Sequence, residues 1–190
     1  MSPTIPQSHP LRIGTVRRDL PICAVTPDLA IAVLNILGDT ELTEAAADEL
    51  SKKLLGLDFA ALVTAEAKSI PLAYALALRL AKPYVVLRKQ YKSYMGEALQ
   101  AQTLSITTGK PQTLILDAKD RELVAGRGVV LVDDVISTGS TLAAMDALMA
   151  KAHARVIAVS AICTEGSVPE LAAPLYALAH LPLFSGASQS

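Results

Sequence analysis

Two adjacent acidic residues stand between an apolar run and a turn of small hydroxyl residues. Asp133 and Asp134 follow Val129–Val132, and the turn Ser137-Thr138-Gly139-Ser140-Thr141 opens a helical pattern. Backbone N–H groups at a helix N-terminus bind anions, and glycine permits the positive φ that lets a phosphate approach closely. Carboxylates repel a phosphate but accept hydrogen bonds from sugar hydroxyls. The segment therefore predicts a site for a phosphorylated sugar, and the alternative is an ordinary strand–turn–helix with two solvated acids.

A short segment between two predicted elements places a lysine and a serine at the start of a helix. The segment Ala65-Glu66-Ala67-Lys68-Ser69 follows the strand-like run Phe59–Thr64 and precedes a helical pattern that begins at Ile70. A helix N-terminus attracts anions, and the lysine adds a positive charge there. The segment is a candidate second anion site, and the alternative is a lysine near an ordinary helix cap.

Three cations cluster just after the strand-like run Tyr84–Leu87. They are Arg88, Lys89 and Lys92. Such a cluster suits a diphosphate ligand, although a solvated basic loop has the same composition. The chain has 17 basic and 18 acidic residues, so there is no bulk positive field, and composition offers no support for nucleic-acid binding.

Strand-like and helix-like patterns alternate along the chain. Helices are predicted over 41–55, 70–80 and 141–151, and strands over 59–64, 84–87, 113–116, 129–132, 156–162 and 175–178. This alternation predicts an α/β fold with a mostly parallel central sheet flanked by helices. Ligands of such sheets bind beyond the carboxyl ends of the strands, where the acidic and basic segments are expected. The stretch 89–112 does not fit the alternation, and long loops of this kind are often functional lids.

The segment Val129–Thr141 resembles the motif with which type I phosphoribosyltransferases bind 5-phosphoribosyl-1-pyrophosphate (PRPP). Four apolar residues, two acids and two variable residues precede a Ser/Thr-Thr-Gly-x-Thr-like turn. It has neither the Gly-Lys-Ser/Thr of a P-loop nor the G-x-G-x-x-G of a dinucleotide site. The segment 65–69 looks like the pyrophosphate loop of adenine phosphoribosyltransferases, usually Glu-Ala-Arg-Gly, with Lys68 and Ser69 in place of the last two residues. The segment 88–92 resembles the Arg-Lys-x-x-Lys stretch before the mobile catalytic loop of adenine and xanthine phosphoribosyltransferases.

This resemblance covers roughly residues 18–183 and implies a single domain over 1–190. It implies the type I phosphoribosyltransferase fold, with a small hood from about 11–27 and 164–183 and a flexible loop over about 90–112. The implied 5-phosphate site is Ser137, Thr138, Gly139, Ser140 and Thr141. The implied pyrophosphate site is Ala67, Lys68, Ser69, Arg88, Lys89 and Lys92, and the catalytic residues are Asp133, Asp134, Arg88 and Lys92. A strained non-proline peptide is expected near Ala67–Lys68. Magnesium (Mg²⁺) would bind through PRPP oxygens and water, with no direct protein ligand.

The implied activity is transfer of the phosphoribosyl group of PRPP to a purine base, with release of pyrophosphate, in nucleotide salvage. Adenine is the first expected base, although Cys23-Ala24 stand where adenine phosphoribosyltransferases carry an Arg-Asp pair ahead of Thr26-Pro27. The resemblance also implies a homodimer. The alternative is a non-catalytic, PRPP-sensing regulator of purine metabolism, a group that carries an extra winged-helix domain ahead of the same fold.

The remaining composition argues against a membrane or secreted protein. Mean hydropathy is +0.40, but no apolar run is long enough to span a bilayer. The first ten residues are polar and Pro-rich, unlike a signal peptide, so a cytoplasmic location is expected. The two cysteines are too few for a disulfide framework, and the three histidines show no metal-ligand spacing.

Overall fold

The computed structural model describes residues 6–104 and 111–185 of the 190-residue chain. The helices of this part are α1 (Thr40–Leu54), α2 (Ile70–Leu80), α3 (Arg121–Val124) and α4 (Ser140–Lys151), with 3-10 turns η1 (Ser93–Met95) and η2 (Ala118–Asp120). The strands are β1 (Ser8–Ile13), β2 (Val16–Thr26), β3 (Leu29–Ala32), β4 (Ala61–Ala65), β5 (Tyr84–Leu87), β6 (Leu99–Leu104), β7 (Pro111–Leu116), β8 (Gly128–Ile136), β9 (Arg155–Glu165), β10 (Leu175–Leu181) and β11 (Leu183–Ser185). None of these helices has the length and apolar character needed to cross a bilayer.

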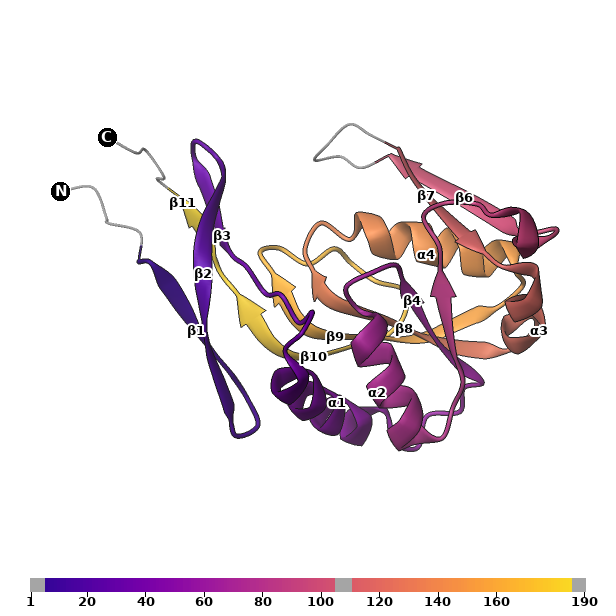
Figure 1. Cartoon of the computed structure of the whole chain (residues 1–190), viewed down its shortest axis with the longest axis horizontal. Coiled ribbons are helices and arrows are strands. Elements are labelled where there is room, and N and C mark those ends of the chain that lie inside the picture. Colours follow the sequence, from indigo (N-terminus) through magenta and orange to yellow (C-terminus); the bar gives the residue numbers. More distant parts are fainter. Residues whose placement is uncertain (1–5, 105–110, 186–190) are drawn as a thin grey trace.

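A five-stranded parallel sheet in the order β10-β9-β8-β4-β5 forms the middle layer (Figure 1). Helices α1 and α2 cover one face of this sheet and α4 covers the other, so each face contributes to its own apolar core. The α/β fold expected from the alternation of elements is therefore confirmed. Because these strands are parallel, the loops after β4, β5 and β8 all leave the sheet at one edge, where such sheets bind ligands.

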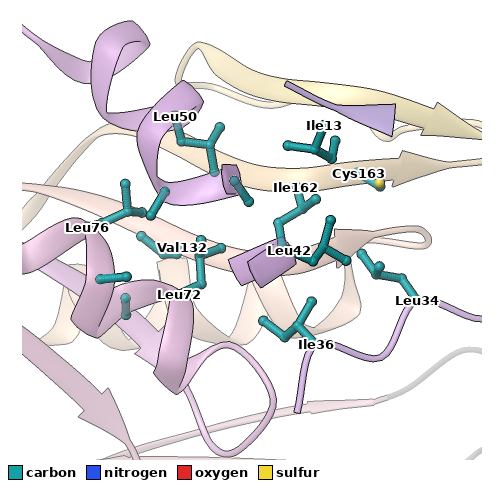
Figure 2. Packing of buried hydrophobic residues seen from close by; sticks show 14 of the residues in the cluster. Ile13, Leu34, Ile36, Leu42, Leu50, Leu72, Leu76, Val132, Ile162 and Cys163 are labelled. Carbon is teal, nitrogen blue, oxygen red and sulfur yellow. The ribbon is translucent and has the colours of Figure 1, made fainter. Parts of the chain in front are cut away.

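Local sequence signals determine where α1 and α2, the helices on the first face, begin. The side chain of Asp39 caps α1 by accepting a hydrogen bond from the backbone N–H of Leu42, at 3.1 Å. Pro71 lies in the first turn of α2, where its fixed φ and missing N–H cost nothing. Spacings of three and four residues then place leucines of both helices over the sheet. Figure 2 shows this packing, with the labelled residues Ile13, Leu34, Ile36, Leu42, Leu50, Leu72, Leu76, Val132, Ile162 and Cys163.

Strand β8 is longer than predicted, and the two acids lie inside it rather than after it. The neighbouring strand β9 continues alongside, pairing Ala161 with Asp133 and Thr164 with Ile136. Strand β4, on the other side, makes its last pair between Thr64 and Val132. The acids are therefore hydrogen-bonded into the sheet on one side only, and the loop after β4 runs past their other side.

The stretch 89–112 is not the irregular segment that the sequence suggested. Strand β6 lies within it and pairs antiparallel with β7. Met95 and Ala101 are buried, and the ammonium of Lys151 in α4 donates to the backbone oxygen of Gln100 at 2.8 Å. The alternation of apolar and polar residues in β6 is short, and α4, the helix on which the strand packs, comes much later in the chain. No local pattern therefore revealed the strand. Residues 105–110 of the predicted flexible loop lie outside the described residues.

A second, four-stranded antiparallel sheet in the order β1-β2-β3-β11 lies at one end of the molecule (Figure 1). Residues 11–27 of the predicted hood fall mainly in β1 and β2, whereas 164–183 include β10, which belongs to the central sheet. Arg18 of β2 connects this sheet to α1, because its guanidinium binds both carboxylate oxygens of Asp39, at 2.7 and 2.8 Å. Arg18 is also the main cause of the lowered pKa of Asp39.

Candidate active site

The acidic and basic segments meet at the carboxyl edge of the central sheet. They follow or end β4, β5 and β8, which are neighbours in that sheet. A cleft of about 190 Å³ lies between them. Its lining combines the loop after β4, one lysine after β5 and the end of β8 with the start of α4, namely Ala65, Glu66, Ala67, Lys68, Ser69, Lys89, Asp133, Asp134, Val135 and Thr141.

Asp133 and Asp134 are tied to the loop after β4 by one serine. The hydroxyl of Ser69 donates to Oδ1 of Asp133 at 2.7 Å and accepts from the backbone N–H of Asp134 at 2.9 Å. Lys68 provides the opposite charge, because its Nζ lies 3.5 Å from Oδ2 of Asp134. The same Nζ also donates to the backbone oxygen of Leu34 at 3.3 Å, so Lys68 links the acid to the segment before α1.

Burial and a neighbouring negative charge make Asp133 a weaker acid than an exposed aspartate. Burial first, and then the negative charge of Asp134, raise the pKa of Asp133 to about 7. Hydrogen bonding from Ser69 acts in the opposite direction and favours the ionised form of Asp133. The site therefore holds a carboxyl group whose charge changes near neutral pH, and whose environment depends on the loop after β4.

Glu66 connects the loop after β4 to the end of β5. It accepts from Nε of Arg88 at 2.9 Å and from the backbone N–H of Lys89 at 2.9 Å. These contacts, the Lys89 N–H first, lower the pKa of Glu66 and keep it ionised. Arg88 is thereby engaged beside the cleft, whereas Lys89 lines it. The match of Glu66 to the family loop did not by itself predict this ion pair with Arg88.

The peptide bond between Glu66 and Ala67 is cis, one bond before the expected place near Ala67–Lys68.

The hydroxyl turn forms the other half of the site. Residues Ser137, Thr138, Gly139, Ser140 and Thr141 line a hollow of about 30 Å³ that they share with Asp133 and Val135 at the N-terminus of α4. Gly139 has a φ of 75°, so the expectation that this position needs a left-handed backbone is confirmed. Pro169, in the loop after β9, lies against it: a Cβ on Gly139 would come within 2.6 Å of Cγ of Pro169. No sequence signal indicated this contact.

Lys92 is a predicted site residue that lies apart from the cleft described above. It is exposed at the start of η1 and is not among the residues that line the cleft. Its backbone N–H contacts Sδ of Met95 at 3.4 Å.

The fold and the site together define an α/β protein with a hydroxyl-rich turn at a helix N-terminus and paired carboxylates at the carboxyl edge of a parallel sheet. Residues 34–173 match the family model described as a phosphoribosyl transferase domain. The chain belongs to the phosphoribosyltransferase family, as the resemblance of its motifs implied.

Relatives in this family differ in the base that they are named for. An adenine phosphoribosyltransferase of Agathobacter rectalis is 32% identical over 126 residues, which are 66% of this chain and 69% of that protein. One of Thermosipho africanus is 30% identical over 148 residues, covering 78% and 84%. A hypoxanthine/guanine phosphoribosyltransferase of Methanococcus voltae is 35% identical over 105 residues, covering 55% and 52%, so the match spans about half of that relative.

Solved structures share the fold at low sequence identity. An adenine phosphoribosyltransferase from Thermoanaerobacter pseudethanolicus has a TM-score of 0.67 at 20% identity, covering 92% of this chain and 95% of that one. The Trypanosoma brucei enzyme, in complex with AMP, pyrophosphate and ribose-5-phosphate, has a TM-score of 0.63 at 18% identity, covering 76% and 67%. At these identities the likeness concerns the fold alone.

Proposed function

We propose that the protein transfers the phosphoribosyl group of PRPP to a purine base, with adenine as the first candidate, and releases pyrophosphate. The observation that carries this proposal is the meeting of a hydroxyl-rich turn at a helix N-terminus, two carboxylates and the loop containing Lys68 at one sheet edge. The relatives described above are named as enzymes, which favours catalysis over the regulatory alternative. The homodimer implied by the family resemblance and the cytoplasmic location expected from the sequence remain predictions.

Each part of PRPP has a proposed partner in this site. The backbone N–H groups and hydroxyls of residues 137–141 would hold the 5-phosphate. Asp133 and Asp134 would accept hydrogen bonds from the ribose hydroxyls, because ionised carboxylates are acceptors only. Pyrophosphate would meet the loop Ala67–Ser69 and Lys89, with Arg88 adjacent.

The residues would act mainly through charge. As the bond between the ribose carbon and pyrophosphate breaks, the sugar becomes oxocarbenium-like and the leaving group gains negative charge. The two carboxylates stabilise the cationic sugar, and Lys68, Lys89 and Arg88 stabilise the leaving group. A nitrogen of the base then bonds to the same carbon, and its proton passes to water or to the departing pyrophosphate.

Magnesium fits this site as a companion of PRPP. The described residues include no group of three or more His, Cys, Asp or Glu side chains that could hold a metal ion. We expect the ion to be held by pyrophosphate and ribose oxygens and by water, since Mg²⁺ retains water readily. Bound there, it would offset charge on the leaving group. Lysines on the cleft wall are suited to the phosphate oxygens that the ion leaves free.

A panel of bases tests the proposed function. Purified protein is incubated with PRPP, Mg²⁺ and adenine, hypoxanthine, guanine, xanthine, uracil or orotate in turn, and pyrophosphate release is measured. We expect release with purines, adenine first, and incomplete selectivity among them, because Cys23-Ala24 provides no charged pair to read the base. Exclusive use of a pyrimidine would refute the purine assignment, and gel-shift binding to DNA without any turnover would favour the regulator.

We also propose that the segment containing Lys92 closes over bound PRPP. Closure would exclude water, which competes with the base for the sugar, and would bring Lys92 toward pyrophosphate. Limited trypsin digestion checks this: Mg-PRPP at saturation should slow cleavage after Lys92 at least several-fold. Cleavage after Lys52, exposed on α1, serves as the control and should not change. Equal cleavage after Lys92 with and without ligand would contradict closure. Lys110, a second trypsin site, lies outside the described residues.

A further inference from the structure

Ser69 occupies a position where the pyrophosphate loop that this segment resembles has glycine, so its hydroxyl is an addition of this chain. The side chain is buried, with 1% of the residue exposed. Besides the 2.7 Å bond to Asp133 and the 2.9 Å bond from the N–H of Asp134, its Oγ lies 3.4 Å from Oδ1 of Asp134. Every hydrogen bond that the structure gives this hydroxyl is to the acidic pair.

Helix capping does not account for the hydroxyl. Ser69 is the N-cap of α2, a position where serine ordinarily accepts a hydrogen bond from a backbone N–H of the first turn. Here the side chain makes no such bond. The stabilisation that a capping serine ordinarily gives a helix is therefore forgone in favour of contacts with a different strand.

We propose that Ser69 is a positioning residue that holds the carboxylate of Asp133 in the orientation that the sugar requires. The inference rests on the proposed function. Since the same loop is the proposed pyrophosphate site, Ser69 would join the leaving-group half of the cleft to the sugar half. Its hydrogen bond also favours the charged form of Asp133, against burial and the charge of Asp134.

Other ionisable groups lie near the pair, and replacing Ser69 removes none of them. Lys68 is paired with Asp134, and Glu66 and Lys89 line the same cleft. Cys163 is buried on β9, the strand next to the pair, and burial, with a smaller effect of Asp134, raises its pKa to about 12. Because Cys163 stays neutral and the replacement removes no charged group, a change in the titration of Asp133 can be attributed to the missing hydroxyl.

The test compares Ser69→Ala with Ser160→Ala. Ser160 is equally buried, on β9, and its hydroxyl has no hydrogen-bond partner among the described residues, so it controls for removing a buried hydroxyl. Values of kcat and KM for PRPP are measured from pH 5.5 to 9. For Ser69→Ala we expect kcat to fall about tenfold, as for one hydrogen bond to a charged group, with KM changed less than about threefold. The acid limb of the profile should move to higher pH, because the bond that lowers the pKa of Asp133 is lost.

Ser69→Thr, which keeps a hydroxyl, should recover most of the kcat and the original profile. If Ser69→Ala fails to fold, Ser69→Cys replaces it, because a thiol keeps the volume but donates weakly. An unchanged profile and kcat in the Ser69 variant, or an equal change in Ser160→Ala, would overturn the inference.

A second measurement separates this inference from the proposed function. Titration of ¹³C-labelled aspartate carboxyls by NMR follows Asp133 without any turnover. We expect a higher pKa for Asp133 in Ser69→Ala than in the unaltered protein. If the base panel shows no activity but this rise is seen, the transferase proposal fails and the tether stands; if the pKa does not rise, the tether itself is wrong.

Discussion

Replacing Gly139 by valine is expected to reduce PRPP affinity at least about a hundredfold while the chain still folds. The backbone there has a φ of 75°, which β-branched side chains rarely adopt, at a cost of about 1–2 kcal/mol. The added Cβ would also lie 2.6 Å from Cγ of Pro169, so the turn or the loop after β9 must shift. Either shift misplaces the N–H groups that the proposal assigns to the 5-phosphate. Calorimetric titration with Mg-PRPP measures the loss.

Gly126 provides a matched control for backbone strain. Its φ is 71°, and a Cβ there would meet nothing within 4 Å. It precedes β8, at the end of the strand opposite the cleft. Gly126→Val should therefore lose stability through strain yet keep the PRPP affinity of the unaltered protein. A folded Gly139→Val protein with normal affinity would contradict the phosphate cradle.

Asp133→Asn is expected to weaken catalysis and to stabilise the fold at alkaline pH. Loss of a charged acceptor for sugar hydroxyls should lower kcat/KM for PRPP about tenfold to about a hundredfold. The opposite effect on stability follows from the pKa of Asp133, which folding raises from 3.8 to about 7. Between these values the folded protein binds a proton that the unfolded chain has lost, so the free energy of unfolding falls as pH rises. Asparagine carries no such charge.

The melting temperature, measured against pH, checks the second half of this prediction. The difference between Asp133→Asn and the unaltered protein should be small near pH 4 and largest above pH 7, where a gain of about 3 °C or more is expected. Asp134→Asn should also lower kcat/KM, with little loss of thermal stability. Unaltered kcat/KM in both variants would remove the carboxylates from the proposed mechanism.

What the sequence alone determined is local. Helix α2 begins at Ile70 and ends at Leu80, as predicted, because Pro71 and a run of good helix formers specify it over short range. Strand β5 likewise matched at Tyr84–Leu87. The left-handed conformation of Gly139 could also be predicted from neighbouring residues, since a strand, a tight turn and a helix follow one another there in a continuous piece of chain. The order of the three charged segments was read directly from the sequence.

Only the tertiary structure decided which of these charged groups meet. The hydroxyl of Ser69 bonds to acids 64 and 65 residues away, and Glu66 reaches Arg88 across 22 residues. Pro169 lies against Gly139, and the apolar side of β6 packs on α4. The residues next to a hydroxyl or a carboxylate in the sequence do not indicate which distant group it will bond to. The partner, and with it the proton affinity of Asp133, is set by how parallel strands distant in the chain bring their ends to one edge.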